Sequence, residues 1–234
     1  MQQASCRLRW KKWKTKTKQK FVKNQATFKA RAVEFFIREE VLKFGDFTLK
    51  SGRKSPYFFN TGSLCTGEQL ADLGELYAEK LNSIPEFRDA TVIFGSAYKG
   101  IPIAVSTAIA ISKLGRKGMR AVSDRKEAKT HGDVSGFLGV IKRGDKVVIV
   151  DDVISTGGTK IEALEKLKEI GCEPLGFIIA FDRKEKQQGS NKTALESLVT
   201  STGLPVYPLA TASDIAHVKP EFASVLEAHL ASTA

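Results

Sequence analysis

The segment VVIVDDVISTGGT, from Val147 to Thr159, constrains the fold of this chain more than any other. Its four leading aliphatic residues are typical of a strand that is buried on both faces of a parallel sheet. Asp151 and Asp152 follow, and after one more aliphatic pair come hydroxyl groups and two glycines. Two adjacent carboxylates buried without partners would be very costly. We therefore expect them at the carboxyl end of the strand, where open α/β sheets bind their ligands.

Short apolar runs alternate with segments of helical periodicity along most of the chain. The patterns predict strands at 47–52, 55–62, 91–94, 146–150, 175–181 and 204–209. They predict helices at 23–43, 67–81, 101–114, 159–170 and 193–199. Elements alternating in this way imply right-handed crossovers and an α/β fold with a mostly parallel central sheet flanked by helices. No linker interrupts the alternation, so we expect one domain over residues 25–234.

The net charge of +11 belongs to one end of the chain. Residues 1–31 hold eleven Lys and Arg residues and no acidic residue; removing these from the total of 37 leaves 26, equal to the 26 acidic residues. Because like charges repel one another, we expect residues 1–24 to form a basic, disordered extension. A nucleic-acid contact, an anionic-membrane contact or an organelle-targeting segment are the alternatives. The neutral remainder argues against nucleic acid as a partner of the domain.

Cellular location is constrained by two further features. No apolar run approaches the roughly 20 residues that a transmembrane helix requires, so we expect no membrane partner. The three cysteines, Cys6, Cys65 and Cys172, lack metal-ligand spacing and are an odd number. They are typical of a reducing compartment, and we expect a cytoplasmic protein whose basic extension leaves organelle targeting open.

The turn after the two carboxylates has the composition of a phosphate site. Glycines let a backbone approach its ligand closely, and successive N–H groups at a helix N-terminus form an anion site. The carboxylates are strong acceptors for sugar hydroxyls. The segment is thus suited to a phosphorylated ribose, although a strand, an acidic turn and a capped helix without function would have some of the same residues.

The complete pattern resembles the 5-phosphoribosyl 1-diphosphate (PRPP) signature of the type I phosphoribosyltransferases. Three more segments are similar to those of orotate phosphoribosyltransferases: LKFGDFTLKSGRKSPYFFNTG at 42–62, GSAYKGIPIA at 95–104 and DRKEAKTHGD at 124–133. With FDRKEK at 181–186, the resemblance covers about residues 25–230 in the same order.

The resemblance implies a type I phosphoribosyltransferase fold with a small hood and a mobile catalytic loop. It implies an enzyme of de novo pyrimidine (UMP) synthesis that converts orotate and PRPP to orotidine 5′-monophosphate and diphosphate. It also implies a homodimer whose lid loop is shared across subunits. Mg²⁺ would be held mainly through PRPP, near Asp151 and Asp152 and without direct protein ligands, as suits an ion that keeps many of its waters.

The resemblance also assigns site residues. The PRPP contacts it implies are Lys50, Tyr98, Lys99, Arg125, Lys126, Lys129, His131, Asp151, Asp152, Val153, Ile154, Ser155, Thr156, Gly157, Gly158 and Thr159. The catalytic residues among these are Lys129, His131, Asp151 and Asp152, with Lys129 stabilising or protonating the departing diphosphate. The orotate contacts it implies are Phe58, Phe59, Ser155 and Arg183.

The residues themselves leave alternatives open. Lys99 could simply be an exposed loop lysine, and the charged segment at 124–133 could be a solvated hairpin without function. Arg183 could instead form a surface ion pair with Asp182 or Glu185. Strand alternation sends either Phe58 or Phe59 into the core.

Small departures from the family pattern, such as Ser96 where Pro is common, weaken the choice of orotate over another base. They leave a sister phosphoribosyltransferase as an alternative. The second alternative is a non-catalytic PRPP-sensing regulator that kept the fold and uses the basic extension to bind nucleic acid.

Overall fold

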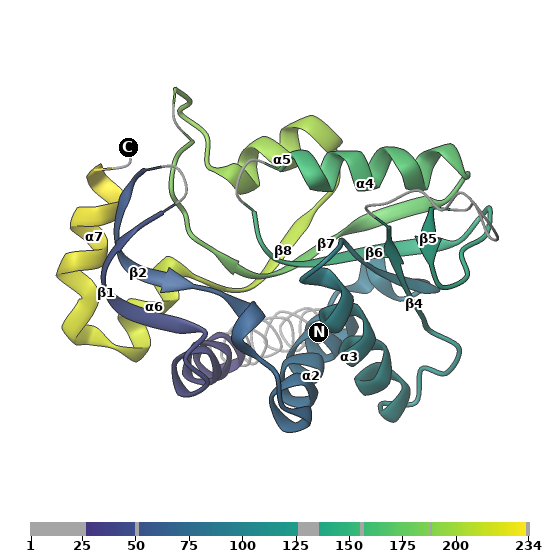
Figure 1. The fold of residues 1–234 in the computed structure, drawn as a ribbon, viewed down its shortest axis with the longest axis horizontal. Helices are drawn as coiled ribbons and strands as arrows, with labels where there is room; N and C mark the ends of the chain where they lie inside the picture. Colours follow the sequence, from purple (N-terminus) through teal and green to yellow (C-terminus); the bar gives the residue numbers. More distant parts are fainter. Residues whose placement is uncertain (1–26, 50–51, 126–135, 155–156, 188, 233–234) are drawn as a thin grey trace, which may run out of the picture.

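The central sheet is built from the short apolar runs of the sequence. The computed structural model describes residues 27–49, 52–125, 136–154, 157–187 and 189–232. Six strands lie in the order β5-β4-β3-β6-β7-β8 (Figure 1). Their bounds are Val92–Gly95 (β3), Arg120–Asp124 (β4), Phe137–Leu138 (β5), Lys146–Val153 (β6), Glu173–Asp182 (β7) and Val206–Thr211 (β8). Only β5 pairs antiparallel with its neighbour, so the mostly parallel sheet is confirmed.

Helices cover both faces of this sheet (Figure 1). Residues 27–38, α2 (Gly67–Ser83) and α3 (Gly100–Lys113) lie on one face, and α4 (Gly158–Glu169) and α5 (Ala194–Thr202) on the other. The strand β6 serves both cores, since Val148 and Val150 pack with the first group and Val147 and Ile149 with the second. A strand buried on both faces needs this continuous apolar run.

Glycines allow two close contacts between elements on the α2–α3 face. A Cβ on Gly95, the last residue of β3, would lie 1.9 Å from the carbonyl oxygen of Gly100 at the start of α3. A Cβ on Gly74 in α2 would lie 2.4 Å from the carbonyl oxygen of Ser106 in α3. The turn from β3 into α3 therefore requires glycine, and it sets the position of the loop between them.

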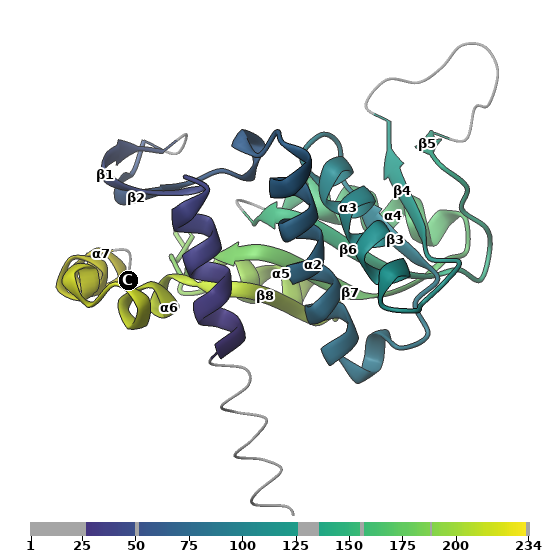
Figure 2. The same ribbon diagram turned by 90° about the horizontal axis from the view of Figure 1, so that it is seen from below.

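A smaller unit lies beyond the carboxyl ends of β6 and β7. It contains an antiparallel hairpin, β1 (Leu42–Thr48) and β2 (Lys54–Phe59), and two helices, α6 (Ala212–Val218) and α7 (Ala223–Ser232). Figure 2 shows the hairpin and these helices together at one end of the molecule. Elsewhere along the described residues, short 3₁₀ turns lie at Thr61–Ser63, Pro85–Phe87 and Pro220–Phe222. This unit corresponds to the small hood that the family resemblance implies.

Several boundaries differ from the prediction. The helix predicted to run to Lys43 ends at residue 38, because Glu40 adopts a positive φ of 54° and the chain turns into β1 at Leu42. The strands β4 and β5 and the helices α6 and α7 were not predicted at all. β4 is short and partly polar, and Phe137–Leu138 is too short to give a periodic signal.

Two expectations fall outside the described residues. The basic extension at 1–24 lies within residues 1–26, and most of the charged segment at 124–133 lies within 126–135. Among the helices that the structure does describe, none has the length and apolar character needed to span a bilayer.

Candidate active site

The two adjacent carboxylates lie at the carboxyl end of β6, as the sequence predicts. Asp151 is 9% exposed and Asp152 is 5% exposed. The backbone N–H of Asp152 donates to Asp151 Oδ1 at 2.9 Å, and that of Val153 donates to Asp152 Oδ1 at 2.8 Å. The hydroxyl of the buried Tyr77 donates to the carbonyl oxygen of Asp151 at 2.8 Å. Hydrogen bonds to the side chains of Asp151 and Asp152 and to the backbone of Asp151 therefore fix the end of β6.

Each carboxylate has its own lysine. Lys160, in the first turn of α4, donates to Asp151 Oδ2 at 2.6 Å, and Lys99 donates to Asp152 Oδ2 at 2.7 Å. The Lys160 side chain is 5% exposed, whereas that of Lys99 is 46% exposed. Burial raises the pKa of Asp151, and the neighbouring Asp152 acts in the same direction, while Lys160 opposes both. The pair with Lys160 is thus a fixed part of the fold, and Lys99 is the partner with room to move.

The glycine turn ends at the N-terminus of α4. Gly157 has φ 84°, a left-handed conformation that favours glycine, and it is the residue before the helix begins. The first backbone N–H groups of a helix have no partner within it, so those of Gly158 and Thr159 are donors for an anion. Both residues are exposed. Ile154 is buried in the core, so only its backbone is available to a ligand.

The SAYKG loop connects β3 to α3 beside the carboxylates. The Ala97–Tyr98 peptide is cis. The backbone N–H of Ala97 donates to Asp124 Oδ1 at 2.7 Å, which attaches this loop to the end of β4. Tyr98 is 66% exposed. The contact of Lys99 with Asp152 brings this loop and the end of β6 into one site.

Arg183 follows β7 and lies in a second group of polar residues. Its Nε and Nη2 donate to Glu185 Oε1 at 3.0 and 2.7 Å, and Nη2 also donates to Ser55 Oγ at 3.0 Å. The guanidinium carbon lies 4.5 Å from the centroid of the Tyr57 ring. Of the two ion-pair partners that the sequence allowed, Arg183 therefore takes Glu185. Its side chain remains 16% exposed.

The phenylalanine pair divides between core and surface, as strand alternation requires. Phe59 is buried, and its ring stacks on that of Phe181 with centroids 4.8 Å apart. Phe58 is 39% exposed, and its ring lies 5.5 Å from that of Phe47. Only Phe58 has a ring face available to a ligand, and the contribution of Phe59 is limited to its backbone.

Of the remaining expected site residues, the structure places Arg125 outside these two groups. Arg125 donates from Nε to the carbonyl oxygen of Phe137 at 3.0 Å, so its side chain is directed along β5. Six more lie outside the described residues: Lys50, Lys126, Lys129, His131, Ser155 and Thr156.

Sequence reasoning missed the residues that hold the expected ones in place. Lys160 contacts the carboxylate of Asp151, Tyr77 its backbone carbonyl, and Asp124 the SAYKG loop. Arg53 and His229 contact Glu185. Lysine in the first turn of a helix gives no sign that it will be buried. His229 lies 46 residues after Arg183 in sequence, and no periodic pattern connects them.

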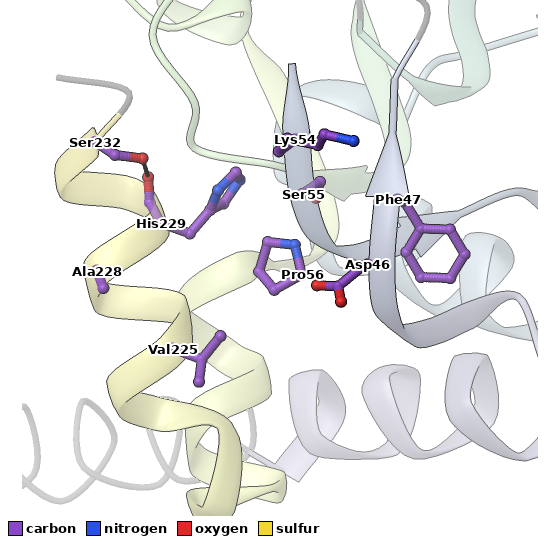
Figure 3. Close-up of a pocket in the computed structure, with 9 residues that line it drawn as sticks. All are labelled: Asp46, Phe47, Lys54, Ser55, Pro56, Val225, Ala228, His229 and Ser232. Carbon is purple, nitrogen blue, oxygen red and sulfur yellow. Dashed lines mark hydrogen bonds between the residues drawn. The ribbon is translucent and has the colours of Figure 1, made fainter. Parts of the chain in front are cut away.

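A pocket of about 650 Å³ lies between the hairpin and α7 (Figure 3). It is lined by Asp46, Phe47, Lys54, Ser55, Pro56, Val225, Ala228, His229 and Ser232. None of these residues belongs to the carboxylate site. Ser55 and His229 connect the pocket to the group around Arg183.

The donor set at the end of β6 is compatible with Mg²⁺. Within the described ranges, no three His, Cys, Asp or Glu side chains gather in a way that could hold a metal ion. Two adjacent carboxylates are present instead. Mg²⁺ often binds through one or two carboxylates together with substrate phosphates and water, so these residues fit it.

Comparisons with known proteins agree with this geometry. A family model described as "Phosphoribosyl transferase domain" matches residues 65–205. An orotate phosphoribosyltransferase of Bifidobacterium longum is 43% identical over 197 residues, which cover 81% of this chain and 84% of that protein. One of Methylococcus capsulatus is 44% identical over 183 residues, covering 78% and 84%.

The likeness extends to three-dimensional structure. The crystal structure of an orotate phosphoribosyltransferase from Francisella tularensis superposes with a TM-score of 0.76 at 32% identity, covering 86% of this chain and 97% of that one. These similarities confirm the expected type I phosphoribosyltransferase fold. The chain therefore belongs to the orotate phosphoribosyltransferase family.

Proposed function

We propose that this protein transfers the 5-phosphoribosyl group of PRPP to orotate, giving orotidine 5′-monophosphate and diphosphate in the synthesis of UMP. The observation that carries the proposal is a pair of carboxylates at the end of β6, one of which, Asp152, contacts the half-exposed Lys99 of the β3–α3 loop. A glycine turn at a helix N-terminus lies next to them. Carboxylates for ribose hydroxyls, N–H groups for a phosphate and a lysine for a diphosphate are the groups that PRPP requires.

The two lysines have different tasks in this proposal. Lys160 is buried and keeps Asp151 in place. Lys99 is half-exposed, so it leaves Asp152 for the more highly charged diphosphate when PRPP binds. Asp152 then accepts hydrogen bonds from the ribose hydroxyls. In the absence of ligand, the contact between Lys99 and Asp152 neutralises a carboxylate that would otherwise be buried with its charge unpaired.

Transfer forms a bond between a ring nitrogen of orotate and the ribose carbon, and breaks the bond from that carbon to diphosphate. The protein contributes mainly by holding both reactants in line and by stabilising the negative charge on the departing oxygens. Lys99 is suited to the second task. Lys129 and His131 are assigned to it by resemblance, with Lys129 as stabiliser or acid. Mg²⁺, when bound with PRPP, adds positive charge at the diphosphate oxygens.

The orotate site in this proposal lies between the hood and the end of β7. Arg183 presents a guanidinium to the orotate carboxylate, a pairing that planar guanidinium groups favour. Phe58 offers an exposed ring from the hairpin, and the backbone of Phe59 lies next to it.

The proposed working form is a homodimer in which the lid at 124–133 closes over the partner's site. Exposed apolar side chains on α3 support an interface there, since Val105 is 45% and Ile109 56% exposed and the two are four residues apart on one helix face.

The proposed location of the protein is the cytoplasm, on the basis of its cysteine usage. Fractionation of the source cells would test it.

The deciding experiment follows the ultraviolet absorbance of orotate on addition of PRPP and Mg²⁺. Loss of absorbance that depends on all three components is the expected result. A folded protein that leaves orotate unchanged but consumes a purine base would instead be a sister phosphoribosyltransferase.

A further inference from the structure

Glu185 is the centre of a buried group that joins the hood to Arg183. Its side chain is 9% exposed, and its Oε1 accepts from Arg183 and lies 3.0 Å from His229 Nε2. Its Oε2 accepts from Arg53 Nη1 at 3.3 Å. The hydroxyl of Tyr57 lies 3.4 Å from Oε1. Four side chains from three segments of the chain thus meet at one carboxylate.

The contacts of Glu185 leave part of the Arg183 guanidinium available. Glu185 and Ser55 engage Nε and Nη2, while Nη1 takes part in no hydrogen bond found among the described residues. The guanidinium also lies over the ring of Tyr57. Arg183 is therefore held in one orientation, with a donor left for a ligand.

The charge of the group favours an anion. Arg53 and Arg183 carry two positive charges, and Glu185 carries one negative charge. Burial acts to raise the pKa of Glu185, but the hydrogen bonds from Arg183 and His229 and the charge of Arg183 outweigh it and lower that pKa, so Glu185 is ionised at neutral pH. One positive charge remains uncompensated within the group, which matches the single carboxylate of orotate.

His229 links the C-terminal helix to this group. It is 9% exposed on α7 and projects toward the strand that carries Ser55 (Figure 3). The ring of His229 also packs edge-on against that of Tyr57, with centroids 6.0 Å apart. The position of Glu185, and through it that of Arg183, therefore depends on a residue of α7 that contacts the same carboxylate oxygen as Arg183 does.

We propose that His229 and Glu185 are positioning residues that orient Arg183 for the orotate carboxylate, so that the C-terminal helix is part of the base-binding site. The inference rests on the function proposed above. Neither residue touches the reacting atoms. Their effect is expected on orotate binding alone, because the carboxylates and lysines that serve PRPP lie in a different group of contacts.

The test compares steady-state kinetics of the full-length protein with those of His229→Ala. Loss of a hydrogen bond to a buried charged group should raise the KM for orotate about tenfold, while kcat and the KM for PRPP change less than about twofold. His229→Gln keeps an N–H group within reach of Glu185, so its KM for orotate should stay within about threefold of the wild type. Glu227→Ala, at an exposed position on the same helix, is the matched control.

Glu185→Gln provides a second measurement of the orotate KM if His229→Ala does not fold. The amide keeps the shape of the side chain but loses the charge that holds Arg183, so the KM for orotate should rise by at least as much as in His229→Ala. An orotate KM within twofold of the wild type in folded His229→Ala or Glu185→Gln would overturn the inference. A parallel loss of PRPP affinity, measured by calorimetry, would overturn it as well, because general damage to the site predicts that loss.

The two proposals fail in different ways. If wild-type protein does not consume orotate, the proposed function is wrong. If wild-type protein is active and the variants keep its orotate KM, only the positioning role is wrong.

Discussion

At the scale of single residues, the site depends on which lysine partners each carboxylate. Asp151 and Asp152 are adjacent in sequence, yet one is paired with a buried lysine and the other with a half-exposed one. Burial makes the first pair structural, since a buried charge that loses its partner is strongly destabilising. Exposure makes the second pair exchangeable with solvent and ligand.

Replacing Lys160 with Met should destabilise the protein. Asp151 would keep its buried position and lose its positive partner, which should lower the free energy of unfolding by about 3 kcal/mol at neutral pH. Urea unfolding measures this change. Lys168→Met, at an exposed position on the same helix, should alter the stability little. Equal stabilities of the two variants would contradict the structural role of Lys160.

The pH dependence of the same variant follows from the raised pKa of Asp151. The folded state binds this proton more tightly than the unfolded state, whose ordinary pKa is 3.8, so stability falls as pH rises through the interval between the two pKa values. Removing Lys160 raises the folded pKa further. The loss of unfolding free energy in Lys160→Met relative to wild type should therefore become smaller on mild acidification. A loss that becomes larger would show that Asp151 is not its source.

Replacing Lys99 with Met should weaken PRPP binding. The variant keeps the stem of the side chain and loses the charge proposed to meet the diphosphate, so the dissociation constant of PRPP should rise by about 10-fold or more. Calorimetry with Mg²⁺ present measures it. Lys113→Met, an exposed lysine at the opposite end of α3, is the control. An unchanged PRPP affinity in Lys99→Met would leave Lys99 with no role beyond neutralising Asp152.

At the scale of elements, the site depends on how closely β3 and α3 approach each other. The turn between them carries Lys99, and Gly95 and Gly100 allow a contact that no side chain would permit. The same turn is attached to β4 through Asp124. The position of Lys99 is thus set by backbone packing and not by its own side-chain contacts alone.

A methyl group at Gly95 should disturb both stability and PRPP binding. Gly95→Ala places a Cβ against the backbone of Gly100, and overpacking of this kind costs about 1–3 kcal/mol of unfolding free energy. Thermal or urea unfolding measures the change. Gly67→Ala, at the start of α2 where a Cβ would have nothing within 4 Å, should be neutral or slightly stabilising. Two variants of equal stability would contradict the close approach.

The sequence predicted elements well where apolar periodicity was strong. The strands β3, β6 and β7 and the helices α2, α3 and α4 were found because their side chains pack on the central sheet. The helix predicted over 23–43 is too long at its C-terminal end, because the chain turns at Glu40 and β1 begins at Leu42. The weakly patterned α7 was missed. Contacts such as His229 with Glu185 depend on tertiary packing, so no local pattern could reveal them.

At the scale of the whole molecule, the hood and the central sheet each contribute one half of the proposed site. The sheet provides the carboxylates and the glycine turn, and the hood provides Ser55, Tyr57 and His229 around Arg183. The exposed face of α3 adds a third element, an apolar surface on a helix that begins at the site itself.

Charges on the α3 face should convert the proposed dimer to monomers. The double variant Val105→Glu, Ile109→Lys places two solvated charges in the interface, and sedimentation should show a molecule of half the wild-type mass. Val225→Lys, at an exposed apolar position on α7, should keep the wild-type mass. A wild-type protein that sediments as a monomer, or a double variant that remains dimeric, would contradict the α3 interface.

The central claim is that the paired carboxylates and the glycine turn bind the phosphoribosyl group. Calorimetric titration of the folded protein with PRPP in the presence of Mg²⁺ tests it most directly. We expect saturable heat at one site per chain, and loss of at least tenfold in affinity in Asp152→Asn, because a neutral amide accepts a ribose hydroxyl less strongly than a carboxylate does. Absence of binding to the wild-type protein, or equal affinity in the variant, would contradict the account.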